Sequence, residues 1–145
     1  MRVVLDANVI IAAFATRGLC HALFVLCVDQ HEIMLSHEIL KEVAGALQKK
    51  LKVPPTVVQD TRDFLTNHAS IQKPKRLSKR VSRDPSNDDV LALAEQPKAD
   101  YIITGDEDLL ILKRHGDIPI VLPRQFWEVL KNKKGRTDKP LRRPV

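Results

Sequence analysis

The stretch Val3-Val-Leu-Asp-Ala-Asn8 indicates the architecture of the whole chain. Its three leading apolar residues form the kind of short run that is typical of a fully buried strand in a parallel sheet. The run ends at Asp6, where burial of a carboxylate costs free energy unless a partner compensates for it. Ligands of open α/β sheets bind at the carboxyl ends of the strands, which makes Asp6 a candidate functional residue. Asp6 is equally a good N-cap for a helix at about residues 9–15, and the stretch alone leaves both roles open.

Strand and helix patterns alternate along the rest of the chain. Short apolar runs predict further extended segments, at about residues 32–35, 70–72, 101–104 and 118–122. Helical spacing and chain breakers predict helices, at about residues 20–28, 37–51, 56–68, 109–114 and 123–131, with one more through residues 90–94. This alternation predicts an α/β sandwich built on a parallel sheet.

Length and charge distribution predict one domain followed by a basic tail. A chain of 145 residues can bury a real core in a single domain, which we assign to residues 1–130. Residues 131–145 carry seven lysines and arginines against one acidic residue, so we expect a flexible basic tail there. No stretch has the apolar length of a membrane span or the pattern of a signal peptide. We therefore expect a cytoplasmic protein without membrane contact.

Acidic residues gather where the predicted strands end. Asp6 follows the first strand and Asp106 follows the strand at 101–104, so parallel pairing brings both carboxylates to one edge of the sheet. Asp84 and Asp88 lie at the start of the helix through 90–94. Glu42 lies on the helix at 37–51, where its spacing also suits an ordinary exposed glutamate.

The donor type points to a hard metal ion and to phosphate chemistry. Carboxylates without histidine or cysteine partners suit Mg²⁺ or Mn²⁺ rather than zinc, and such ions activate water for attack on a phosphoryl group. A basic run precedes the acidic segment and favours a nucleic acid over a small phosphate ester. The candidate nucleic-acid-binding residues of this run are Lys73, Lys75, Arg76, Lys79, Arg80 and Arg83.

Four segments, taken together, resemble the PIN domain, and in particular its bacterial branch of VapC-like toxins from toxin–antitoxin pairs. They are the stretch through Asp6, the segment from Ser36 to Glu42, residues 84–89, and Thr104-Gly-Asp-Glu-Asp-Leu-Leu110. The resemblance covers about residues 1–130. It implies a three-layer α/β/α sandwich around a central parallel sheet and a metal-dependent endoribonuclease that uses Mg²⁺ or Mn²⁺.

The resemblance also implies roles for single residues. The acids that it assigns to catalysis and metal binding are Asp6, Glu42, Asp88 and Asp106, with Asp108 as a further metal ligand. The residues that it assigns to supporting roles are Asn8, Ser36, Asp84, Asn87 and Thr104. The branch usually reads Asp-Pro-Asp-Asp-Asn where this chain has Asp84-Pro-Ser-Asn-Asp88. Asp84, Asp88 and Asp89 therefore all stay candidates for the third acidic ligand, and Asp88 is preferred.

The resemblance further implies RNA as substrate, an antitoxin protein as partner and a homodimer. The main alternative is a non-catalytic RNA-binding or assembly module with the same fold, which the presence of all four acids disfavours. A phosphatase with an aspartyl nucleophile is a weaker alternative, because such enzymes usually have a second aspartate two residues after the first. This chain has Asn8 at that position.

Overall fold

The structure is a computed structural model that describes residues 1–77, 79, 81, 84–95 and 98–135. Its strands are β1 (Arg2–Leu5), β2 (Glu32–Ser36), β3 (Ser70–Gln72), β4 (Tyr101–Ile103), β5 (Arg114–His115) and β6 (Ile118–Val121). Its helices are α1 (Ala7–Ala15), α2 (Leu19–Gln30), α3 (His37–Lys49), α4 (Pro55–His68), α5 (Pro85–Glu95), α6 (Glu107–Leu110) and α7 (Pro123–Gly135). The predicted alternation of strands and helices is confirmed. For most of the elements, the observed boundaries differ from the predicted ones by a few residues.

The strands described form one sheet in the order β3-β2-β1-β4-β6-β5. The first five of these pair in parallel, and β1 lies in the interior between β2 and β4. In the β1–β4 pair, Leu5 lies opposite Ile103. This register brings the residues that follow both strands to the same edge of the sheet, as the sequence predicted for Asp6 and Asp106.

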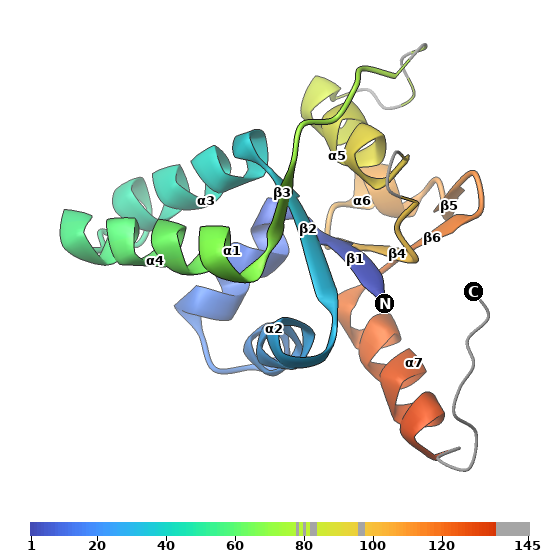
Figure 1. Cartoon of the computed structure of the whole chain (residues 1–145), viewed down its shortest axis with the longest axis horizontal. Helices are drawn as coiled ribbons and strands as arrows, with labels where there is room; N and C mark the ends of the chain where they lie inside the picture. Colours follow the sequence, from blue (N-terminus) through green and yellow to red (C-terminus); the bar gives the residue numbers. More distant parts are fainter. Residues whose placement is uncertain (78, 80, 82–83, 96–97, 136–145) are drawn as a thin grey trace.

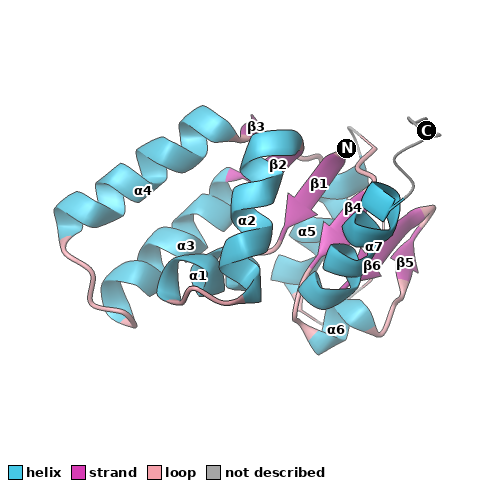
Figure 2. Cartoon of the chain, turned by 90° about the horizontal axis from the view of Figure 1, so that it is seen from below, coloured by secondary structure: helices cyan, strands magenta, loops and turns pink. Residues whose placement is uncertain are grey.

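Helices cover both faces of the sheet, which confirms the three-layer α/β/α architecture. The helices α2 and α7 pack against each other on one face, whereas α5 packs on β1 and β2 from the other (Figures 1 and 2). The helices α3 and α4 pack side by side and extend away from the sheet beyond β3 (Figure 2). The buried side chains of β1, Val3 to Leu5, are fully inaccessible to solvent, as expected for a strand covered on both faces.

The sheet is not purely parallel, and the helix predicted at residues 109–114 is correct only in its first two residues. The helix α6 ends at Leu110, and β5 pairs antiparallel with β6 through Arg114 opposite Pro119. Lys113 adopts a left-handed backbone conformation (φ 65°), and Gly116 (φ 61°) opens the two-residue turn between β5 and β6. A glycine with positive φ at the first turn position is typical of a tight β-hairpin, so this segment turns back as a hairpin instead of continuing as a helix.

The carboxy-terminal helix is longer than predicted. It continues to Gly135 and so includes residues 131–135, which the sequence analysis placed in the tail. Residues 136–145, the rest of the predicted tail, lie outside the described residues. In the part of the chain described, no single helix is long and apolar enough to cross a membrane. The helices α1 and α2 reach that length and composition only as a pair, bent by 109° at the break between them.

Candidate functional site

Asp6 is a buried carboxylate at the carboxyl end of β1. Only 7% of its surface is exposed, and it begins α1 as its N-cap, with Oδ1 accepting a hydrogen bond from the backbone N–H of Ala7 (2.8 Å). Its Oδ2 accepts a hydrogen bond from the Thr104 hydroxyl at the end of β4 (2.7 Å). Burial raises the pKa of Asp6, and the charges of Asp106 and Asp84 raise it further, against the effect of the two hydrogen bonds. Asp6 therefore caps α1 and also lies near other carboxylates.

Asp106 is held next to the same threonine. The backbone N–H of Asp106 donates to the Thr104 hydroxyl oxygen (2.9 Å), so this hydroxyl links the ends of β1 and β4. The Asp106 carboxylate accepts from the backbone N–H of Asp108 and caps α6 (2.9 Å). Asp108 itself lies in the first turn of α6. Thr104 is completely buried, which makes it the structural link of the site.

Glu42 reaches the same region from α3. Ser36 begins this helix, because its Oγ accepts a hydrogen bond from the backbone N–H of Ile39 (3.2 Å). Glu42 lies just over one turn into the helix. Partial burial raises its pKa, and the charges of Asp6, Asp84, Asp89 and Glu38 add to this effect. Glu42 is itself exposed, and the charges that act on it show that it lies near Asp6 and Asp84.

Asp84 and Asp88 differ in what they face. The charge of Asp84 acts on both Asp6 and Glu42, while its Oδ1 accepts from the backbone N–H and the hydroxyl of Ser86 at the start of α5 (3.0 and 2.8 Å). The Asp88 carboxylate accepts hydrogen bonds from the backbone N–H of Val81 (3.2 and 3.3 Å). We define the acidic cluster as Asp6, Glu42, Asp84 and Asp106, which are connected by these charge interactions.

The remaining predicted site residues lie around this cluster. Asn8 is exposed in the first turn of α1, and Asn87 is buried in α5, with its backbone N–H donating to the carbonyl of Asp84 (3.0 Å). Asp89 is exposed on α5. Its pKa is raised overall, because desolvation and the charge of Glu38 outweigh the opposing effect of Arg76. The sequence analysis did not single out Glu38. The signal was available, because Glu38 and Glu42 are four residues apart and share one helix face.

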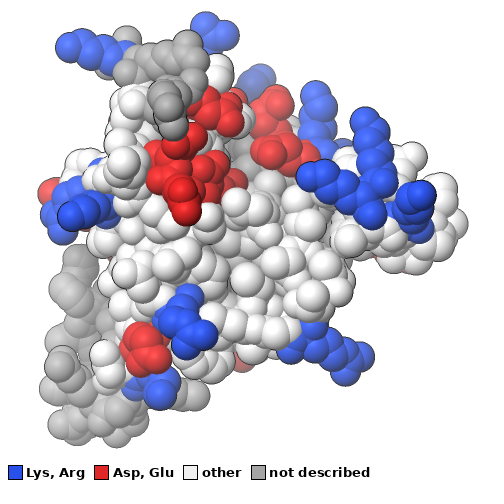
Figure 3. Space-filling model, turned by 180° about the vertical axis from the view of Figure 1, so that it is seen from behind, with Lys and Arg blue, Asp and Glu red and all other residues white. Residues whose placement is uncertain are grey.

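Among the predicted basic residues that the structure describes, Arg76 lies close enough to an acidic residue of α5 for its charge to act on it. Lys73, Lys75, Arg76 and Lys79 are described, and the charge of Arg76 acts on Asp89. Arg80 and Arg83 lie outside the described residues. Figure 3 shows acidic side chains gathered in one patch on this face of the molecule, with lysine and arginine side chains on either side of it. This arrangement suits a polyanion that passes over an acidic centre.

The donor set of the acidic cluster fits a hard divalent cation, because all four side chains are carboxylates whose negative charges repel one another. Within the described residues, however, no group of three or more His, Cys, Asp or Glu side chains lies close enough to hold an ion as they stand. The structure thus shows a cluster of suitable ligands without a closed coordination shell.

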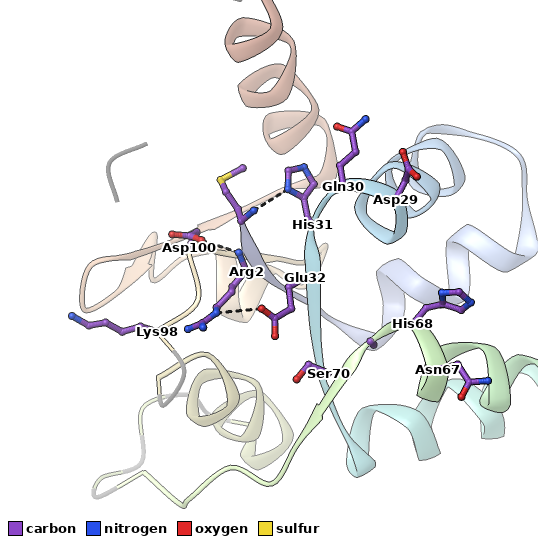
Figure 4. A pocket seen from close by; sticks show the side chains of 12 residues that line it. Arg2, Asp29, Gln30, His31, Glu32, Asn67, His68, Ser70, Lys98 and Asp100 are labelled. Atoms are coloured by element: carbon purple, nitrogen blue, oxygen red, sulfur yellow. Dashed lines mark hydrogen bonds and ion pairs between the residues drawn. The ribbon is translucent and has the colours of Figure 1, made fainter. Parts of the chain in front are cut away.

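A separate pocket of about 820 Å³ lies at the opposite edge of the sheet, near the amino ends of β1 and β2. Its charged groups contact one another (Figure 4): Arg2 pairs with Glu32 (3.3 Å) and donates its backbone N–H to Asp100 (2.8 Å). No member of the acidic cluster lines this pocket, so we do not assign the candidate chemistry to it.

Comparison with known proteins identifies the family. No curated protein matches the chain at a significant level. A family model described as PIN domain matches residues 2–108, nearly three quarters of the chain. The matched region contains all four residues of the acidic cluster and Asp108. PIN domains are generally nucleases, so the fold is a nuclease fold. The chain belongs to the PIN domain family.

Proposed function

We propose that this protein is a metal-dependent endoribonuclease that hydrolyses phosphodiester bonds of RNA at the acidic cluster. The observation that carries the proposal is the burial of Asp6 beside other carboxylates, which raises its pKa. Such an arrangement opposes folding at neutral pH unless a cation offsets the repulsion. A divalent cation, Mg²⁺ or Mn²⁺, is the partner that fits carboxylate ligands.

Each residue of the cluster has a role in this proposal. Asp6, Glu42 and Asp106 would hold the cation, together with Asp84 or Asp88. When bound, the cation supplies Lewis acidity toward a phosphoryl oxygen and lowers the pKa of a coordinated water. Thr104 fixes the direction of the Asp6 carboxylate through its 2.7 Å hydrogen bond. Ser36 fixes the start of the helix that carries Glu42.

We favour Asp84 over Asp88 as the third acid. The support for this choice is electrostatic: the charge of Asp84 acts on Asp6 and Glu42. The Asp88 carboxylate, by comparison, accepts from the backbone of Val81. Asp108 is a further metal ligand in this proposal, since it follows Asp106 in the same helical turn.

RNA is the proposed substrate because basic side chains flank the acidic cluster. Lys73, Lys75, Arg76 and Lys79 would bind phosphates on the side of the loop that follows β3. The resemblance of the motifs to the VapC-like branch supports a toxin role in the cytoplasm, with an antitoxin that covers the site. The half-exposed rings of Phe14 and Phe64, both in contact with Phe24, supply an apolar surface for a homodimer.

An Asp6→Asn variant distinguishes this proposal from a non-catalytic RNA-binding module. The variant and the parent are incubated with a labelled RNA and a DNA of the same sequence, with Mn²⁺, with Mg²⁺ and with EDTA. A nuclease loses cleavage in the variant and in EDTA but still retains RNA in a filter-binding assay. A binding module cleaves in no condition and binds RNA equally well with and without the substitution.

A further inference from the structure

The exposed face of α3 carries opposite charges at its two ends. Glu38, Glu42, Gly45 and Lys49 recur at intervals of four, three and four residues, so they lie along one face of the helix. The opposite face is buried through Ile39, Leu40, Val43 and Leu47. Glu42 belongs to the acidic cluster, since the charges of Asp6 and Asp84 act on it. Lys49 follows it by seven residues, which is about two turns or roughly 10 Å along the axis. The exposed face therefore leads from the acidic cluster to a basic end.

Gly45 lies between the acidic and the basic part of this face. Glycine in the interior of a helix is unfavourable, which raises the question of whether packing or function accounts for it. Apart from its chain neighbours and the backbone of its own helix, no atom of the described residues lies within 4 Å of the position that a Cβ would take at Gly45. Close packing inside the molecule therefore does not explain the glycine. Because glycine has no side chain, the helix backbone is uncovered at this position, and another molecule can approach it closely.

Further lysines extend the basic end. Lys49 is exposed at the end of α3, and Lys50 and Lys52 follow it, whereas Lys41 is exposed beside Glu42 at the acidic end of the helix. Figure 3 shows lysine and arginine side chains gathered next to the acidic patch, on the side where α3 and α4 extend away from the sheet. The loop that follows β3 runs toward α5, away from the side on which α3 and α4 extend (Figure 1). Basic residues thus flank the cluster in two directions.

We propose that the exposed face of α3, from Lys41 over Gly45 to Lys49, is a second nucleic-acid-binding surface that holds the backbone of a substrate strand beyond the scissile phosphate. The lysines contact phosphates, and the strand passes closely over Gly45. The substrate is then an oligonucleotide that continues along α3, and a dinucleotide that spans only the acidic cluster is a poor ligand. This inference rests on the proposed nuclease function and adds the extent and direction of its substrate site.

Binding measurements on the full chain test the inference. The parent is the cleavage-deficient Asp6→Asn variant, so that binding is measured without hydrolysis. Lys41→Gln and Lys49→Gln are introduced together, Gly45→Glu is made separately, and Lys131→Gln on α7 is the matched control. Binding of a fluorescent single-stranded RNA is followed by anisotropy over a series of salt concentrations, and thermal unfolding of each variant is recorded alongside.

Loss of two phosphate contacts lowers the slope of log affinity against log salt by about 1.4, since each contact contributes about 0.7 for a single strand. Gly45→Glu weakens RNA binding while the melting temperature stays equal or rises, because glutamate favours the helix more than glycine. Lys131→Gln leaves affinity and slope unchanged. In the cleaving protein, the α3 substitutions raise KM and leave kcat near its original value.

Three results would overturn the inference, and they can be distinguished from one another. If the protein cleaves RNA but the α3 variants behave as Lys131→Gln does, then α3 is not part of the interface and the nuclease proposal stands. If the protein neither cleaves nor binds RNA, the proposed function fails and this inference fails with it. A dinucleotide bound as tightly as the longer strand also contradicts the extended site.

Discussion

The hydroxyl of Thr104 donates a 2.7 Å hydrogen bond to the carboxylate of Asp6, and these two residues are 98 positions apart in the chain. The bond joins the carboxyl ends of neighbouring parallel strands at the point where the acidic cluster is built. Because both residues are buried, the hydrogen bond partly compensates for the desolvation of a carboxylate that water cannot reach freely. The position and the charge state of Asp6 therefore both depend on Thr104.

Replacement of Thr104 by valine should destabilise the protein by about 1–3 kcal/mol, because a buried acceptor loses its donor. The loss should be larger at neutral pH than under acidic conditions, since the hydrogen bond lowers the pKa of Asp6 and its removal lets that pKa rise further. Urea unfolding at two pH values measures both effects. Thr104→Ser keeps the hydroxyl and is the control. Equal stability of the valine and serine variants at neutral pH would speak against this role.

Removal of the Ser36 hydroxyl should weaken the start of α3. Ser36→Ala deletes the bond from the Ile39 N–H, and loss of such an N-cap typically costs about 1 kcal/mol. Because α3 carries Glu42, we expect cleavage to fall together with stability. Ser36→Asp restores a capping oxygen and should recover the stability. Chemical unfolding measures the stability of the three proteins, and a cleavage assay measures their activity. An alanine variant as stable as the parent would exclude the capping contribution.

Glu42 should make the stability of the protein depend on pH in a defined direction. Its pKa in the folded state is raised above the ordinary value of 4.5. Between 4.5 and this raised pKa, the folded state therefore binds more protons than the unfolded state. The contribution of Glu42 to stability therefore decreases as the pH rises through this window, and its ionised form destabilises the fold above it. Glu42→Gln should raise the melting temperature near about pH 7, and the gain should shrink as the pH falls toward 4.5.

Thermal unfolding of Glu42→Gln and of the parent across this range measures the effect. Glu32→Gln, on the opposite edge of the sheet beside Arg2, removes the same charge outside the acidic cluster and serves as the control. Addition of Mn²⁺ should stabilise the parent more than Glu42→Gln, because only the parent keeps all four carboxylates. A Glu42→Gln variant that is less stable than the parent at neutral pH would show that repulsion within the cluster is not the dominant effect.

Asp84 and Asp88 should differ in their importance for cleavage. Asp84→Asn removes a charge that acts on Asp6 and Glu42, and we expect a loss in kcat of about a hundredfold or more, the scale of a lost electrostatic group at a reacting centre. Asp88→Asn should cost less, since the carboxylate of Asp88 accepts from Val81. Single-turnover cleavage by both variants compares them. The reverse order of losses would assign the third acid to Asp88, as preferred from the sequence.

Much of the fold was predictable because the relevant signals are local. The run Val3 to Leu5 is typical of a strand covered on both faces, and Ser36 before an amphipathic pattern indicates the start of α3. The strand β6 was predicted, but β5 was missed, because Ile111 and Leu112 continue an apolar pattern that also suits a helix. Lys113 and Gly116 have positive φ angles that turn the chain back on itself. Helix propensities of the residues do not predict these conformations.

The candidate site was predictable to the extent that it depends on strand ends. Asp6 and Asp106 each follow a buried strand, so parallel pairing alone brings them together. The position of Glu42 and the difference between Asp84 and Asp88 depend on helix orientation across the edge of the sheet. Sequence spacing around α5 places both aspartates at one helix start and does not reveal which of them faces Asp6. In the structure, Asp84 lies near enough for its charge to raise the pKa of Asp6, and this proximity depends on the tertiary structure.

The most direct test of the nuclease proposal is cleavage of a 5′-labelled RNA by the purified protein, beside Asp6→Asn and Asp106→Asn. Each protein is assayed with Mn²⁺, with Mg²⁺ and with EDTA. We predict cleavage by the parent with a divalent cation, none in EDTA, and a loss of at least a hundredfold in both variants. Cleavage that persists at the same rate in EDTA or in both variants would contradict a catalytic site at the acidic cluster.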